Sequence, residues 1–230
     1  MNFTISKTDD TLIYQAIDID GLTEKQLGDM FFTKVDNHYE KKFSVDSLMF
    51  EHDTEKMEIR YNRFIRDEVT KNRTFQDLEE TLFWLISEHD RLGIRWWLTG
   101  STALYVRGIK LFPHDIDVMT YKTEIHKIQD LVYPYIVEPF HHLNNWVVKG
   151  FGVADKNFRI DYAFEPEDWV DQHGNMDFGP YAEKHLEEVI WQGKKIWVPD
   201  IQLQVLSNKI RNRLDRTKLI QEYIDRREST

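Results

Sequence analysis

The sequence predicts a mixed α/β fold of the α+β kind, with a mixed β-sheet core, flanking helices and a helical C-terminal end. Short apolar runs with strand-like alternation gather in the middle of the chain, and segments with helical apolar spacing lie on both sides of them. The composition, 41% hydrophobic and 13% aromatic over 230 residues, provides enough apolar volume for a sizeable core. We expect three parts, residues 1–75, 76–175 and 176–230.

The N-terminal part, residues 1–75, is expected to be a hairpin followed by helices. Residues 2–19 have the pattern of two short strands joined around residues 8–10. Two helical stripes follow, formed by Leu27, Met30, Phe31 and Val35 and then by Met57, Tyr61, Phe64 and Val69. No family is indicated by this part, and its role stays open.

The central part, residues 76–175, is expected to hold the sheet. A helix begins after Thr74 and ends at Gly93, and a buried strand follows over 94–99. Further strands are predicted over 115–121, 135–140, 145–153 and 158–164, with a helix over 122–132.

The last part, residues 176–230, is predicted as a hairpin over 188–199 followed by helices. One apolar stripe of these helices is formed by Leu203, Leu206, Ile210 and Leu214.

Charge and cysteine content narrow the function classes. The net charge of −10 repels nucleic acid at long range, so a small molecule or a nucleotide is favoured as substrate, while a local basic patch leaves tRNA open. The absence of Cys excludes disulfides and thiolate metal sites. No apolar run reaches the ~18 residues of a membrane span, and the first residues lack the features of a secretory signal. We therefore expect a cytoplasmic protein without a membrane partner.

The tripeptide Asp-Ile-Asp occurs twice, and the two copies have different surroundings. Asp18 and Asp20 precede a helical segment, where acids act as caps or interact with the helix dipole. Asp115 and Asp117 lie on a predicted strand, where residues two apart share one face. Two carboxylates on one face repel each other unless a cation lies between them, and their hard oxygens suit Mg²⁺ or Mn²⁺. A solvated strand face is the alternative.

A Gly-Ser pair follows the buried strand over 94–99. Gly100 and Ser101 are expected to form a tight turn, with Ser101 as the N-cap of a short helix that stops at Gly108. Backbone N–H groups at such a turn can hold a phosphate, and the glycine allows close approach. A plain turn and cap is the alternative.

Taken together, Gly100-Ser101, thirteen intervening residues and Asp115-Ile116-Asp117 resemble the signature of the nucleotidyltransferase superfamily, in particular its small bacterial antibiotic-modifying, toxin–antitoxin and abortive-infection members. The family's third carboxylate lies on a later strand, where this sequence has Asp161. The pattern departs mildly from the family, because Thr99 and His114 stand where apolar residues are usual. The resemblance covers roughly residues 94–165.

This resemblance implies a nucleotidyltransferase-like core and the transfer of a nucleoside monophosphate from an NTP to a hydroxyl acceptor, with two Mg²⁺ ions bound by Asp115, Asp117 and the phosphates. Gly100 and Ser101 would bind phosphate oxygens. Asp161 would complete one metal site or accept the proton of the acceptor hydroxyl. The basic candidates for the triphosphate are Arg107, Lys110, Lys209, Arg213 and Arg216, of which the last three are spaced to share one helix face.

Three function classes stay open at this stage. The first is a metal-dependent nucleotidyltransferase acting on a small hydroxyl compound such as an antibiotic. The second keeps the chemistry and changes the acceptor to a protein or a tRNA, as in toxin–antitoxin systems. The third is a non-catalytic nucleotide-binding module. The preferred NTP and the oligomeric state are not indicated by the sequence.

Overall fold

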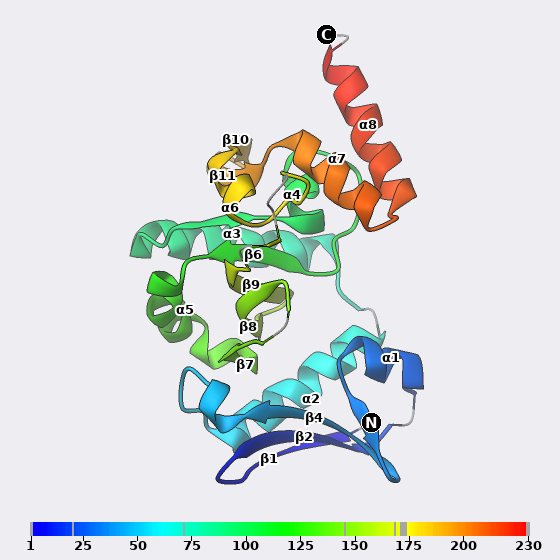
Figure 1. Cartoon of the computed structure of the whole chain (residues 1–230), viewed down its shortest axis with the longest axis vertical. Helices are drawn as coiled ribbons and strands as arrows, with labels where there is room; N and C mark the ends of the chain where they lie inside the picture. The colour runs from blue at the N-terminus through cyan, green and yellow to red at the C-terminus, as the bar shows by residue number, and fades with distance from the viewer. Residues whose placement is uncertain are drawn as a thin grey trace.

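The computed structural model describes residues 2–19, 21–70, 72–144, 146–167, 169–170 and 174–228. A small N-terminal sheet lies at one end of the molecule, a larger sheet lies in the middle, and the C-terminal helices lie at the other end (Figure 1). The mixed α+β fold class is confirmed. None of the helices in the described ranges is both long and apolar enough to span a membrane.

The N-terminal sheet is antiparallel and has the strand order β1-β2-β4-β3. Its elements are β1 (Asn2–Lys7), β2 (Thr11–Asp18), α1 (Glu24–Asp29), β3 (Thr33–Val35) and β4 (His38–Ser44). The predicted hairpin is confirmed, but the predicted helical stripe through Val35 is wrong. Phe31 takes a left-handed φ of 64° directly after α1, which ends the helix, and a two-residue turn at 36–37 then pairs Val35 with His38.

The first Asp-Ile-Asp copy lies at the end of this hairpin. Asp18 is the last residue of β2, and Thr23 is the N-cap of α1, where its side chain and that of Gln26 form a capping box. Asp18 is therefore not the cap of that helix. Asp20 lies outside the described residues.

Helix α2 (Thr54–Thr70) packs across this sheet and confirms the second predicted helix. The Asn62 side chain accepts from the backbone N–H of Phe3 and donates to the carbonyl of Phe3, both at 2.8 Å. Glu58 accepts from the N–H of Ile5 at 2.8 Å. These side chains satisfy the outer edge of β1, which would otherwise expose unpaired backbone groups.

Helix α3 (Phe75–Leu92) begins and ends as predicted. Thr74 and Asp77 form a capping box, and Gly93 follows the helix in the left-handed conformation with φ of 60°. After Gly93, Ile94 and Arg95 the chain enters the central sheet.

The central sheet has the strand order β5-β6-β9-β8-β7, in which β6 and β9 are parallel and the other neighbours are antiparallel. Its strands are β5 (Trp96–Leu98), β6 (Ile116–Thr120), β7 (Ile136–His142), β8 (Val148–Asp155) and β9 (Arg159–Pro166). All five were predicted. His141 and His142 are the last two residues of β7.

The remaining elements surround this sheet. They are α4 (Gly100–Val106), α5 (Ile125–Val132), α6 (Pro180–Lys184), β10 (Leu186–Trp191), β11 (Lys194–Pro199), α7 (Ile201–Ile210) and α8 (Leu214–Glu228). Short 3₁₀ turns occupy Val45–Ser47, Lys122–Glu124 and Tyr133–Tyr135. Helix α8 extends away from the rest of the molecule at its C-terminal end (Figure 1).

Three predictions for the helices are wrong. Helix α4 already includes Gly100 and Ser101, and its N-cap is Thr99, so Ser101 is not the cap. In the C-terminal part, Leu206, Ile210 and Leu214 are exposed, because α7 turns a partly polar face inward. Asn212 has a φ of 53° and separates α7 from α8, so residues 209, 213 and 216 do not share one helix face.

Candidate active site

Three carboxylates converge at the end of the parallel strand pair. Asp117 on β6 is in register with Asp161 on β9, and Asp115 immediately precedes β6. One ligand oxygen from each of the three lies within 4.8 Å of the other two. The structure therefore brings together the three acids that the sequence singled out.

Burial and mutual repulsion disfavour the ionised forms of the carboxylates in this cluster. Burial raises the pKa of Asp117 well above its usual value, and the charges of Asp115, Asp161 and Asp177 add to this effect. Burial also raises the pKa of Asp161 to about 6, with Arg159 acting in the opposite direction. The cluster is electrostatically unfavourable without additional positive charge.

Gly100 lies directly against this cluster. A Cβ atom at residue 100 would lie 2.0 Å from Oδ2 of Asp117, and the residue has a φ of +61°. Only glycine meets both conditions without displacement. Ser101 follows in the first turn of α4 and is buried. The Gly-Ser turn and the Asp pair, which are separated in the sequence, thus form one structural unit.

A fourth carboxylate, Asp177, was not identified from the sequence. Its side chain is buried and accepts from the backbone N–H of Gly100 at 3.2 Å and from the hydroxyl of Ser207 at 2.7 Å. The carbonyl of Asp177 accepts from the Thr99 hydroxyl at 2.7 Å. Asp177 lies in an irregular segment without a motif, so only the Asp itself was a signal.

The inward face of α7 completes the support of the turn. Gln204 donates to the carbonyl of Gly100 at 3.2 Å, and Asn208 donates to the carbonyl of Gln204. Both side chains are buried, as is Ser207. These contacts explain why α7 buries polar residues where an apolar stripe was predicted.

Arg159 binds Asp161 through two parallel hydrogen bonds. Its Nε and Nη2 lie 2.6 and 2.7 Å from the two carboxylate oxygens of Asp161. The two residues lie two apart on β9, so they share one face of the strand. This fork fixes the orientation of the Asp161 carboxylate and neutralises part of its charge.

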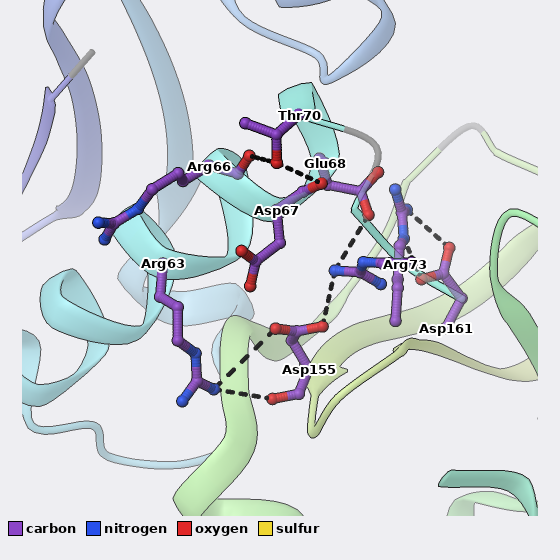
Figure 2. Close-up of polar contacts among 9 residues, drawn as sticks. Arg63, Arg66, Asp67, Glu68, Thr70, Arg73, Asp155 and Asp161 are labelled. Carbon is purple, nitrogen blue, oxygen red and sulfur yellow. Dashed lines mark hydrogen bonds and ion pairs between the residues drawn. The ribbon is translucent and has the colours of Figure 1, made fainter. Parts of the chain in front are cut away.

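Next to this pair lies a second ionic network that joins α2 to the sheet. Figure 2 shows Arg73 between Asp155 and Glu68, with Arg63 on the other side of Asp155. Arg73 lies 2.8 Å from Asp155 and 3.1 Å from Glu68. The network connects the N-terminal part of the chain to β8, close to the carboxylates.

The predicted basic residues divide into two groups. Arg216, in the first turn of α8, is half-buried, and its guanidinium has no ion pair or hydrogen bond in the described part of the chain. Burial and nearby Arg213 lower the pKa of Arg216, whereas the charges of Asp117, Asp115 and Asp177 act in the opposite direction. Arg216 therefore lies within electrostatic reach of the acidic cluster, with Arg213 as its neighbour.

Arg107 does not join this group. Its buried guanidinium donates to the carbonyl of Pro199 at 2.6 Å and pairs with Glu187 at 2.6 Å, so it holds the β10–β11 hairpin in place. Lys209 lies at the exposed end of α7.

The residues of the cluster fit a divalent metal ion. The donors are hard carboxylate oxygens, which Mg²⁺ and Mn²⁺ prefer. Burial and the neighbouring negative charges both raise the pKa of Asp117, and a bound cation would stabilise its ionised form. Asp115 and Asp117 have no ion-pair partner in the described residues, whereas Asp161 has Arg159.

No protein-family model matches the chain, and no characterised protein matches it in sequence. Its fold is similar to that of TM1012 from Thermotoga maritima, assigned as a nucleotidyltransferase, with 17% identity, 64% of this chain and 94% of that chain covered, and a TM-score of 0.45. The lincosamide antibiotic adenylyltransferase LnuA, bound to lincomycin, is 16% identical, with 62% of this chain and 96% of that chain covered and a TM-score of 0.45. ANT(2″)-Ia in complex with adenylyl-2″-tobramycin is 12% identical, with 66% of this chain and 90% of that chain covered and a TM-score of 0.41. These likenesses concern the fold, so the chemistry of the site must be argued from its own residues.

Proposed function

We propose that this protein is a metal-dependent nucleotidyltransferase that transfers a nucleoside monophosphate from an NTP to a hydroxyl group of a small molecule. The observation that supports this is the convergence of Asp115, Asp117 and Asp161 beside the backbone of Gly100. Carboxylates next to a glycine turn provide both a cation site and a place for phosphate oxygens. An ordinary acidic surface would require neither the close approach of Gly100 to Asp117 nor the register of β6 with β9.

In this proposal, Asp115 and Asp117 hold a divalent cation such as Mg²⁺ or Mn²⁺. When bound, this cation supplies neutralisation of the phosphate charges during an in-line displacement. Gly100 and Ser101 orient phosphate oxygens, and Arg213 and Arg216 bind the triphosphate. Most of the rate acceleration would come from positioning and charge stabilisation.

Asp161 is proposed to accept the proton of the attacking hydroxyl group. Both of its oxygens already bond to Arg159, so it offers a metal ion less charge than its two neighbours do. The acceptor oxygen would form a bond to the α-phosphorus, the bond to the β-phosphate oxygen would break, and pyrophosphate would leave. The hydroxyl proton passes to Asp161.

Asp177 would act as a positioning residue. It bonds the N–H of Gly100 and the hydroxyl of Ser207, so it fixes the turn relative to α7. Through Gly100 it also fixes the space that Asp117 occupies. It is not expected to touch the reacting atoms.

The proposal is tested by calorimetric titration with Mg²⁺ and a non-hydrolysable α,β-methylene NTP analogue. We expect binding by the wild type that is lost in Asp115→Asn and retained in Asp130→Asn, whose carboxylate is exposed on α5. Equal binding by wild type and Asp115→Asn would reject the proposed site. Binding of the analogue, with no pyrophosphate released from the natural NTPs in the presence of any hydroxyl acceptor, would favour the non-catalytic module.

A further inference from the structure

A cleft of about 640 Å³ lies between the N-terminal sheet and the central sheet. Its walls come from the end of α1, from β4, from α2 and from the ends of β7 and β8. Arg159 of β9 forms part of its floor. This volume lies within the range of sites that bind drug-sized molecules.

Charged residues that line the cleft also interact with the carboxylates of the acidic cluster. Arg159 lines the cleft and binds Asp161 through Nε and Nη2 of its guanidinium. Glu138, another lining residue, contributes to the raised pKa of Asp161. Burial raises the pKa of Glu68, which also lines the cleft, and the charge of Asp115 adds to that effect. A molecule in the cleft would contact Arg159, which binds the carboxylate that we propose as proton acceptor.

Aromatic rings dominate the uncharged part of the walls. Phe43 and Phe64 come from the N-terminal part, and Trp146 and Phe151 come from the opposite wall, where their rings meet edge to face. Phe31 is 65% exposed and has a left-handed φ of 64°, which is unfavourable for a bulky residue. The fold thus holds an aromatic side chain in a strained position at the rim of the cleft.

The charged side chains of the cleft are already paired with one another or with neighbours. Lys41 binds Glu138 at 2.7 Å, and Lys42 binds Glu40 at 2.6 Å. The other pairs are Arg159 with Asp161, Glu68 with Arg73, and Asp29 with Lys25. Burial lowers the pKa of His141, so this ring stays neutral near pH 7. With these partners included, the described charged residues of the cleft form five pairs of opposite charge, so no net charge selects a polycation or a phosphate backbone.

We propose that this cleft is the acceptor site and that it takes an uncharged, ring-bearing hydroxyl compound of drug-like size. This inference rests on the proposed nucleotidyl transfer. The ring of the acceptor packs between Phe31 and Trp146, and its hydroxyl group points toward Asp161. The N-terminal part of the chain then has a role, because it supplies one wall of the acceptor site.

The pairing of the charged residues in the cleft also argues against an RNA or a polycationic sugar as the acceptor. An RNA would need a continuous path of free cations for its phosphates, and the cations of the cleft are committed to carboxylates. A polycationic sugar would need free carboxylates, and those carboxylates are committed to Lys and Arg. An uncharged ring system needs only the aromatic walls and a hydrogen bond.

The test uses transfer of label from α-³²P-labelled NTPs, with Mg²⁺ or Mn²⁺, to three kinds of acceptor. These are uncharged aromatic glycosides such as 4-nitrophenyl glucoside and galactoside, the polycation kanamycin, and a short RNA with a free 3′ hydroxyl. We expect label in the aromatic glycosides. Trp146→Ala and Phe31→Ala should each raise the KM for the labelled glycoside about tenfold, the size expected for loss of one aromatic contact. The affinity for the NTP analogue should not change.

Trp197→Ala is the matched control, because Trp197 is an exposed aromatic residue on β11 outside the cleft. Its KM should equal that of the wild type. Preferential labelling of kanamycin or RNA, or an unchanged KM in both cleft variants, would overturn the acceptor assignment while leaving nucleotidyl transfer intact. Failure of the wild type to bind the NTP analogue with metal would instead reject the proposed function, and the acceptor site with it.

Discussion

Gly100 and Asp117 lie so close together that a Cβ atom at residue 100 would fall 2.0 Å from a carboxylate oxygen of Asp117. The same glycine has a φ of +61° and donates its backbone N–H to Asp177. One residue therefore meets a conformational requirement, a steric requirement and a hydrogen-bonding requirement. The position of the turn and the position of the carboxylate are fixed by each other.

Gly100→Ala should abolish binding of the NTP analogue with metal, because the new methyl group displaces Asp117 or the turn. We also expect a loss of several kcal/mol in the free energy of unfolding, measured with urea, since the left-handed φ alone costs about 1–2 kcal/mol. Gly93→Ala is the control, with φ of +60° and no atom within 4 Å of the added Cβ. It should lose only the conformational part and keep nucleotide binding. Equal destabilisation in the two variants would show that the Asp117 side chain moves away from the added methyl group at little cost in free energy.

Asp117→Asn should stabilise the metal-free protein at pH 7 while eliminating activity. The raised pKa of Asp117 means that its ionised form costs stability in the fold, and a neutral amide avoids that cost. The gain, about 1 kcal/mol or more, should be largest at high pH and should disappear as the pH falls toward the unfolded-state value of 3.8, where both states carry a protonated acid. Urea unfolding in EDTA from pH 4 to 8 measures it. A variant less stable than the wild type at pH 8 would contradict this account.

The catalytic candidates were predictable because strand alternation and parallel pairing are regular. Asp115, Asp117 and Asp161 lie on or beside strands whose apolar residues point to a core, and the period of two then places the acids on one face. What the sequence does not contain is the pairing of β6 with β9, which the register of Asp117 with Asp161 now supplies.

Other parts of the site depend on contacts between segments far apart in the sequence. Asp177 lies 77 residues from Gly100, in an irregular segment with no periodicity. Arg107 looked available as a cation, but Pro199 and Glu187 bind it. In the N-terminal part, Leu27, Met30 and Phe31 do follow a helical period, and only the left-handed turn at Phe31 shows that the helix stops there. Tertiary contacts decided the cases of Asp177 and Arg107, and a local backbone turn decided the case of Phe31.

Arg216→Gln should weaken binding of the NTP analogue about tenfold or more, the effect expected for loss of a charge-assisted hydrogen bond. Arg216 lies near the acidic cluster and has no ion pair or hydrogen bond to the residues that the structure describes, so its charge is available to a phosphate. Lys218→Gln on the same helix is the control, because Lys218 is exposed and faces Glu222. Calorimetric titration at two salt concentrations measures both variants. An Arg216→Gln affinity equal to that of the wild type would place the triphosphate elsewhere.

Arg73→Ala should destabilise the fold by about 3 kcal/mol, because it leaves the buried carboxylate of Asp155 without its closest cation. Arg73 also lies over the rings of Phe64 and Phe158, so packing is lost as well. Arg63→Ala is the comparison, since Arg63 is half-exposed and its guanidinium lies 4.0 Å from the Asp155 carboxylate. Its effect should stay below about 1 kcal/mol. Urea unfolding of the two variants and of Arg73→Ala with Asp155→Asn tests the pairing, and the double variant should recover part of the loss.

His52→Leu should make stability less sensitive to mild acid. Both ring nitrogens of His52 are buried and have no hydrogen-bond partner among the described residues, and burial, with the charge of Arg60, lowers its pKa to about 4. Between pH 6.5 and 4 the unfolded chain binds a proton at this residue that the folded protein does not, so unfolding becomes more favourable as the pH falls. For this shift the loss between pH 7.5 and 5 is about 2 kcal/mol. Urea unfolding at these two values should show that loss in the wild type and in His126→Leu, an exposed histidine on α5, but not in His52→Leu. The same pH dependence in all three proteins would assign the acid sensitivity to other groups.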